Sequence, residues 1–156
     1  MSHARTPSAS LTEMVQFVLP NDANVLGFIL GGTVMHLIDI AGAIAATRHT
    51  RSQVVTASVD DLQFLHPIRV GDMIILRAWV NAAFHTSMEV EVEVCSEGLT
   101  GERQKTSQAF LTFVSVDKDG HPQPVPPLVA DTDEERARAQ AAHVRREERL
   151  RRRQSQ

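Results

Sequence analysis

The feature that most restricts the fold is the stretch NVLGFILGGTVMHLIDIAGAIAATRH, residues 24–49, which is almost wholly apolar. From Val34 onward its apolar residues recur at helical spacing, and alanine and isoleucine also occupy the other faces of the helix. A helix that is apolar on nearly all sides has to be enclosed by other structure. The sequence therefore predicts a central helix around which the rest of the chain folds.

The same stretch is a poor candidate for a membrane span. Asp39 and His36 lie near its centre, and an aspartate in the middle of a membrane helix costs about 2.5 to 3.5 kcal/mol. The N-terminus lacks the continuous apolar segment of a secretory signal. The single cysteine, Cys95, excludes an intramolecular disulfide and suits a reducing compartment. We therefore expect a cytoplasmic protein without membrane insertion.

The charge of the chain is unevenly distributed. The 156 residues suit a single domain, and the net charge of −3 gives no global basic field of the kind that nucleic-acid-binding proteins carry. Eight of the 16 lysines and arginines nevertheless fall between Arg136 and Arg153. We expect no nucleic-acid partner, an acidic body and a basic C-terminal tail.

Strand patterns flank the central helix. Alternation over residues 12–20 predicts a first strand, and four strand-like runs follow the helix at 53–65, 73–83, 87–95 and 106–117. In the run 87–95, Glu89, Glu91 and Glu93 alternate with apolar residues. We therefore expect one side of the sheet to face water.

The two ends of the chain differ in character. Residues 1–10 are small and polar, and we expect them to be flexible. Residues 132–153 begin with a capping box, Thr132 and Glu135, and predict a charged helix. This helix is either solvated and self-stabilised, or contacts a neighbouring subunit or phosphate. The predicted organisation is a folded domain over 11–130 and a charged helix and tail over 131–156.

The order of these elements defines the fold class. A strand, a long helix, four strands and a terminal helix form an α+β layout, in which an antiparallel sheet of about five strands wraps one helix. One helix covers only one face of such a sheet. The second face and the free edges favour dimerisation through a continuous sheet.

Four segments together resemble the hotdog-fold acyl-CoA thioesterases, specifically the cytosolic acyl-CoA hydrolase branch. They are PNDANVLGFILGGTVMHLIDIAGAIAATRH, VVTASVDDLQFLHPIRVGD, TSMEVEVEV and FLTFVSVDKDGHPQPVPPL, and the resemblance covers about residues 14–150. It implies the hotdog fold and hydrolysis of a fatty acyl-CoA to free fatty acid and CoA, without metal or organic cofactor. It also implies an active site at a dimer interface and a hexamer built as a trimer of dimers.

The resemblance implies two catalytic side chains, Asp39 in LIDIAG and Asn24 in DANVLG. From the residues alone, Asp39 is either a general base or nucleophile, or a carboxylate paired with a buried polar group such as His36. Asn24 either orients the water or the thioester carbonyl, or makes an Asx-turn. The backbone amides of Gly31 and Gly32, where the helix begins, either stabilise an oxyanion or form a tight turn.

The spacing of these residues argues against a site within one chain. Eight residues separate Gly31 from Asp39, which is about 12 Å along a helix. One thioester carbon cannot easily lie beside both. We therefore expect a composite site, in which Asp39 of one subunit faces Asn24 and the helix start of its partner.

Further residues are candidates for binding the substrate. Arg48, His49 and Arg51, where the central helix ends, are the first candidates for the CoA phosphates, although basic residues there are also ordinary partners of the helix dipole. Two hydroxyls and one ring complete the set: Thr86 and Ser87 could reach CoA, and Phe64 could contact the acyl chain or belong to the core.

A second reading is a non-catalytic hotdog protein that binds acyl-CoA and regulates another process. Its output surface would have to be the arginine-rich tail. Acyl-CoA binding without hydrolysis would favour this reading, whereas turnover that depends on Asp39 would favour the enzyme.

Overall fold

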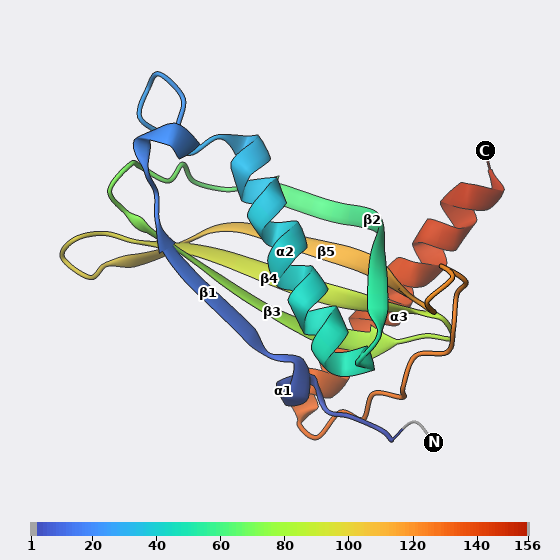
Figure 1. Ribbon diagram of the computed structural model, residues 1–156. Helices are drawn as coiled ribbons and strands as arrows, with labels where there is room; N and C mark the ends of the chain where they lie inside the picture. Colours follow the sequence, from blue (N-terminus) through green and yellow to red (C-terminus); the bar gives the residue numbers. More distant parts are fainter. Residues whose placement is uncertain (1–2, 156) are drawn as a thin grey trace.

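The apolar stretch forms the long helix α2 (Gly31–Thr50), which lies across one face of a curved sheet (Figure 1). The computed structural model describes residues 3–155. The sheet follows the predicted runs closely, and α3 (Asp133–Gln154) lies on its other face. The remaining elements are α1 (Pro7–Ser10), β1 (Thr12–Phe17), the 3-10 turn Pro20–Asp22, β2 (Gln53–Phe64), β3 (Met73–Ala83), β4 (Ser87–Glu97) and β5 (Arg103–Val116).

The five strands form one antiparallel sheet in the order β1-β3-β4-β5-β2. β3, β4 and β5 are central, whereas β1 and β2 form the two edges. The α+β hotdog architecture expected from the sequence, with one helix enclosed by a five-stranded sheet, is therefore confirmed.

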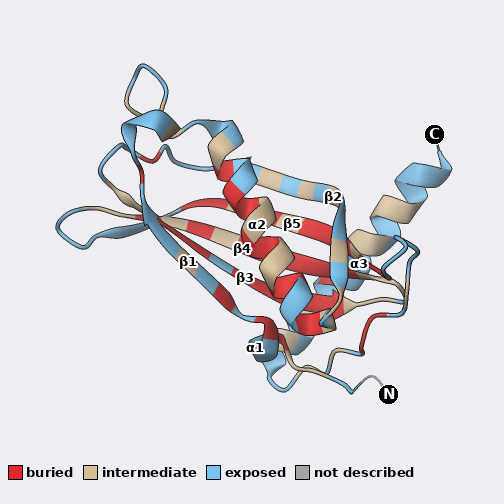
Figure 2. Ribbon diagram, in the orientation of Figure 1, coloured by how far each residue is buried: buried red, intermediate tan, exposed pale blue. Residues whose placement is uncertain are grey.

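The core lies between α2 and the concave face of the sheet. The helix residues that point into it are buried, as are the inward-facing residues of the central strands (Figure 2). Gly42 lets the two layers approach, because a Cβ atom at this position would lie 3.0 Å from Cε2 of Phe113. A contact that short would force the helix and the ring apart, so the glycine fixes how deeply α2 sits.

The outer face of the sheet corrects one expectation. Glu89 and Glu91 were expected to face water, but they are only 1% and 8% exposed. Arg145 of α3 donates to both carboxylate oxygens of Glu89 at 2.7 and 2.8 Å, and its guanidinium lies 3.8 Å from the ring centre of Phe110. The Asn81 amide donates to both glutamates at 3.0 Å. α3 is therefore docked on the sheet and is not a separately solvated helix.

The two ends of the chain meet beside the sheet. The backbone of Arg5 bonds Pro127 and Val129, and the hydroxyl of Ser10 accepts a hydrogen bond of 2.9 Å from Val80 N. Residues 5–10, expected to be flexible, thus contact the folded domain. α3 begins at the predicted capping box, in which Thr132 and Glu135 bond each other's backbone. Within residues 3–155, no helix is long and apolar enough to cross a membrane.

Replacing Arg145 with alanine should lower the free energy of unfolding by about 3 kcal/mol, because it leaves the buried carboxylate of Glu89 without its counter-charge. Urea denaturation measures the change. Arg151→Ala is the matched control, since Arg151 lies in the exposed last turns of α3, and it should change stability by no more than about 0.5 kcal/mol. Equal stability of the two variants would contradict the stabilising role that we assign to the Arg145–Glu89 contact.

Candidate functional site

Two separate hollows border α2, and each holds part of the predicted site. One, of about 470 Å³, lies along the exposed face of the helix and contains Asp39, Arg48 and Arg51. The other, of about 330 Å³, lies where the helix begins and contains Asn24, Gly31 and Phe64. The structure therefore divides the predicted residues between two places on one chain.

Asp39 is half-buried, and its carboxylate has a defined orientation. Its Oδ1 accepts a hydrogen bond of 2.6 Å from the hydroxyl of Thr56 on β2. Within the described residues it makes no hydrogen bond or ion pair with His36, which is exposed. Ile40, Ala43 and Ile44 form apolar walls around it. Oδ1 is thus held by Thr56, and Oδ2 remains available to a water or substrate atom.

Asn24 organises the loop that precedes α2. Its Oδ1 accepts hydrogen bonds from the backbone N–H groups of Leu26 and Phe28 at 2.9 and 3.2 Å. This is the Asx-turn geometry that the sequence left open as an alternative. The turn uses only the carbonyl oxygen, and the side chain is exposed. Over residues 3–155 the Nδ2 group has no protein hydrogen bond, so it can donate to a ligand.

The start of α2 offers backbone donors. Leu30 is the N-cap residue and provides no capping side chain. The amides of Thr33 and Val34 bond to the Leu30 carbonyl, whereas those of Gly31 and Gly32 have no protein acceptor in the described part of the chain. Both glycines are exposed. Free N–H groups at the positive end of a helix dipole are suited to binding a negatively charged oxygen.

Phe64, where β2 ends, closes one side of the hollow at the helix start. A Cβ atom at Gly31 would lie 3.7 Å from its Cζ, so the ring packs directly against the start of α2. The side chain is 53% exposed and does not belong to the core. Leu65, Val34 and Ile68 extend the same apolar wall.

The three basic residues where α2 ends do not act together. Arg48 donates to the Leu11 carbonyl at 2.7 Å, and with Arg51 it lines the hollow of Asp39. His49 was expected to contact the CoA phosphates, and this expectation is wrong for the described fold. Its ring is fully buried and its Nε2 donates to the Pro126 carbonyl at 2.8 Å. Four residues after Ala45, it continues the buried face of the helix.

Thr86 and Ser87 lie elsewhere again. They line a third hollow, between the outer face of the sheet and α3, together with Arg146 and Arg149. The α3 residues that line this hollow belong to the helix that lies across the sheet from α2 (Figure 1). The sequence placed these hydroxyls with Arg48 and Arg51 as substrate contacts, but the structure does not bring the two groups together.

Thr56 is the residue that sequence reasoning missed. It belongs to the segment VVTASVDD that supports the family resemblance, but no property of the threonine itself indicates a role. Its contact with Asp39 depends on how β2 lies beside α2. A register shift between Thr56 and Ser58 lets Thr56 face the helix while Ser58, paired with Thr112, faces α3.

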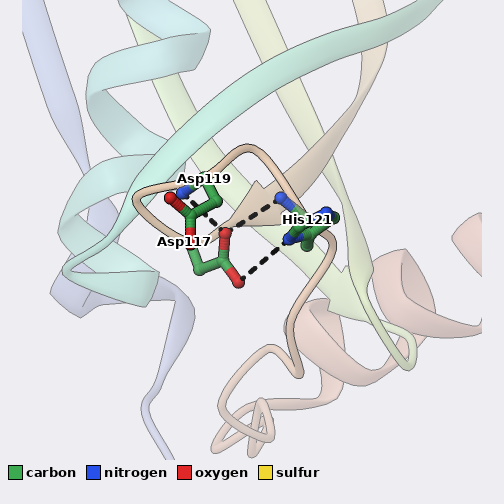
Figure 3. Close-up of side chains that lie close together, drawn as sticks. All are labelled: Asp117, Asp119 and His121. Carbon is green, nitrogen blue, oxygen red and sulfur yellow. Dashed lines mark hydrogen bonds and ion pairs between the residues drawn. The ribbon is translucent and has the colours of Figure 1, made fainter.

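Asp117, Asp119 and His121 also lie close together, in the turn after β5 (Figure 3). Asp117 Oδ1 accepts hydrogen bonds of 2.9 Å from the backbone N–H groups of Asp119 and His121. These bonds account for the cluster as an Asx-turn. Asp119 and His121 are exposed, and we assign the cluster a structural role.

Comparison with known proteins shows that this chain is similar to thioesterases. The model of the thioesterase superfamily matches residues 26–102. The uncharacterized acyl-CoA thioester hydrolase YkhA of Bacillus subtilis is 44% identical over 119 residues, which are 76% of this chain and 69% of that protein. The chain belongs to the thioesterase superfamily.

The cytosolic acyl coenzyme A thioester hydrolase of mouse is 38% identical over 136 residues. The alignment includes 85% of this chain but only 36% of the mouse protein, so the chain corresponds to about a third of that relative.

Two solved structures are similar to this chain over nearly its whole length. An apo-hexameric acyl-CoA thioesterase is 42% identical, with a TM-score of 0.92 and coverage of 96% of this chain and 97% of that one. The acyl-CoA hydrolase of Staphylococcus aureus, solved with butyryl coenzyme A and coenzyme A, is 35% identical, with a TM-score of 0.90 and coverage of 97% and 93%. Alanine variants of an aspartate, an asparagine and a threonine of the S. aureus enzyme have also been solved.

The buried position of His49 predicts a pH dependence of stability. Burial lowers its pKa below the ordinary value, the hydrogen bond to Pro126 acts in the opposite direction, and the charge of Arg5 lowers it further. Below pH about 6.5 the unfolded chain therefore binds a proton that the folded chain does not. The free energy of unfolding should therefore fall between pH 7.5 and 5.5, because protonation of His49 favours the unfolded chain.

Urea denaturation at both pH values measures this loss, and His49→Gln should lack it. His36→Gln is the control, because His36 is exposed on the same helix and should leave the loss unchanged. An NMR titration that gave His49 a pKa of 6.5 or higher would contradict the prediction.

Proposed function

We propose that this protein is an acyl-CoA thioesterase that hydrolyses a fatty acyl-CoA to free fatty acid and CoA. The observation that carries the proposal is the carboxylate of Asp39, held at 2.6 Å by Thr56 in an apolar hollow of a thioesterase-superfamily chain. Relatives that align with most of this chain are named acyl-CoA thioester hydrolases, and the S. aureus structure contains CoA and butyryl-CoA.

The spacing of three polar residues gives further support. Asn24 and Asp39 are 15 residues apart, and Asp39 and Thr56 are 17 apart. The asparagine, aspartate and threonine replaced in the S. aureus variants are separated by the same intervals. This agreement favours Asn24, Asp39 and Thr56 as the polar residues of the site.

In the proposed reaction, Asp39 acts as the general base. Thr56 holds Oδ1, so Oδ2 takes a proton from a water molecule, whose oxygen attacks the thioester carbonyl carbon. The carbonyl oxygen becomes negatively charged and accepts hydrogen bonds from the amides of Gly31 and Gly32 and from Asn24 Nδ2. When the intermediate collapses, the C–S bond breaks, and CoA leaves as a thiol with the proton from Asp39. Direct attack by the carboxylate would give the same products through an anhydride.

A single chain cannot complete this site, because Asp39 and the group of oxyanion donors occupy different hollows. We propose that a second copy supplies the missing half. β2 is an edge strand that presents Val55 and Val59, which are 49% and 43% exposed, and Met35 on α2 is also exposed. Joining two such edges would bring two helices together and cover these residues. The minimum unit is then a homodimer, and the hexameric relative favours a trimer of dimers.

The remaining contacts follow from the two hollows. Arg48 and Arg51 lie beside Asp39 and are candidates to bind the anionic part of the substrate. The apolar wall of Phe64, Leu65 and Val34 is suited to an acyl chain. With cytosolic hydrolases among its relatives, we place the protein in the cytoplasm.

A subunit-mixing experiment tests the composite site. Asp39→Ala and Asn24→Ala homo-oligomers should each lose at least about a hundredfold in kcat/KM, since each lacks one of the two catalytic groups. Heterodimers of the two variants should regain activity at the one interface that pairs an intact Asp39 with an intact Asn24. Thiol release from a series of short- to long-chain acyl-CoA esters measures turnover.

No recovery in verified heterodimers would contradict the composite site. A wild-type protein that binds acyl-CoA but never releases thiol would overturn the enzyme assignment in favour of a regulatory acyl-CoA-binding protein.

A second test concerns Thr56. Thr56→Val keeps the shape of the side chain but removes the hydrogen bond that orients Asp39, and it should lower kcat by about 10- to 100-fold with a smaller effect on KM. Thr47→Val is the matched control, because Thr47 lines the same hollow on α2 and does not hold the carboxylate. If both variants lost activity equally, Thr56 would have no specific positioning role.

A further inference from the structure

The hollow between α3 and the outer face of the sheet, which the proposed reaction does not use, has its own chemistry. Its volume is about 550 Å³, larger than either hollow beside α2. Thr112 and Val114 of β5, with Ser58 of β2, form its floor, and the C-terminal half of α3 forms its wall. Asp39 and Thr56 lie on the opposite face of the sheet.

This hollow has an excess of positive charge. Four arginines line it, Arg146, Arg149, Arg152 and Arg153, against one carboxylate, Asp60. Asp60 is already in contact with two of them, Arg149 at 3.0 Å and Arg152 at 4.0 Å. The lining therefore carries three more positive charges than negative charges. A cavity lined by one sign of charge concentrates ligands of the opposite sign.

The floor carries hydroxyl groups that the protein does not satisfy. Thr112 is 6% exposed, and its Oγ1 is buried without a hydrogen-bond partner among residues 3–155. Ser58 Oγ, opposite it on β2, is buried and unpaired in the same part of the structure. A buried hydroxyl without a partner destabilises a fold unless a ligand or water supplies the missing bond. Both residues line the same hollow as the arginines.

From this arrangement we propose that the hollow binds a ligand that carries phosphate groups. A guanidinium group can donate two parallel hydrogen bonds to the oxygens of one phosphate. The hydroxyl groups of the floor residues would add further hydrogen-bond donors. A single carboxylate would neutralise only one of the three excess charges, whereas a diphosphate matches them. Thr86 and Ser87, expected from the sequence to contact CoA, also line this hollow and add two more hydroxyl-bearing residues.

Two sources of such a ligand are distinguishable. The phosphates of a CoA molecule would make this hollow part of substrate binding, and that source rests on the proposed function. A free phosphate compound would make it a regulatory site, separated by the sheet from Asp39. The chemistry of recognition is the same for both.

Isothermal titration calorimetry of the full chain with inorganic pyrophosphate, CoA and pantetheine tests the proposal. Arg152→Gln combined with Arg153→Gln removes two charges of the hollow, and Thr112→Val removes the unpaired hydroxyl without breaking a protein hydrogen bond. Arg151→Gln is the matched control, because it removes a charge from the same turn of α3 outside the hollow.

Pyrophosphate should bind the wild type. The double arginine variant should weaken binding at least tenfold and Thr112→Val several-fold, whereas Arg151→Gln should stay within twofold. Weakening of CoA but not pantetheine by the same variants would identify CoA as the source, whether or not pyrophosphate alone binds. Unchanged CoA affinity with weakened pyrophosphate binding would identify a free phosphate compound.

Affinities for both pyrophosphate and CoA that are the same in the wild type and in both cavity variants would overturn the proposal, as would a wild type that binds neither. Thr112→Val should not lower the midpoint of urea unfolding, which separates a loss of binding from a loss of fold. Asp39→Ala should abolish turnover and keep pyrophosphate binding, so failure of the thioesterase assignment would leave this test intact.

Discussion

Burial of α2 against the concave face of the sheet is the contact on which the rest of the structure depends. The helix is too apolar to stand in water, and its small residues let the sheet approach closely, as at Gly42 and Phe113. One face of the helix stays outside this core, and that face carries Asp39. The packing that stabilises the fold therefore also places a carboxylate in a half-buried, apolar position.

The outer face of the sheet is held by a different interaction. Here the strands present glutamates and an asparagine in place of aliphatic side chains, and α3 supplies arginines that pair with them and stack on Trp79, Phe84 and Phe110. Such a contact is directional, because each charge has to meet its partner after losing water. The last turns of α3 carry more arginines than Asp60 of β2 can neutralise, and these line the hollow for which we propose a phosphate-bearing ligand.

The predicted elements agree with the structure because periodicity is a local property. The five strands and both long helices could be located from alternation, helical spacing and the capping box at Thr132. His49 could also have been placed correctly, since it continues the buried face of α2 four residues after Ala45. The rise of a helix alone predicted that Asp39 lies too far from the start of α2 to share one site with it. In agreement, Asp39 lies in one hollow and Gly31 in another.

By itself, the sequence determined that an apolar helix would be wrapped by an antiparallel sheet, and which polar groups that helix would carry. Only the tertiary structure decided the partners of those groups. Thr56 meets Asp39 because β2 lies beside α2, and Glu89 is buried because a helix some 50 residues later in the chain covers it. Periodicity shows which face of an element a residue occupies, but contacts between distant segments depend on how whole elements pack together.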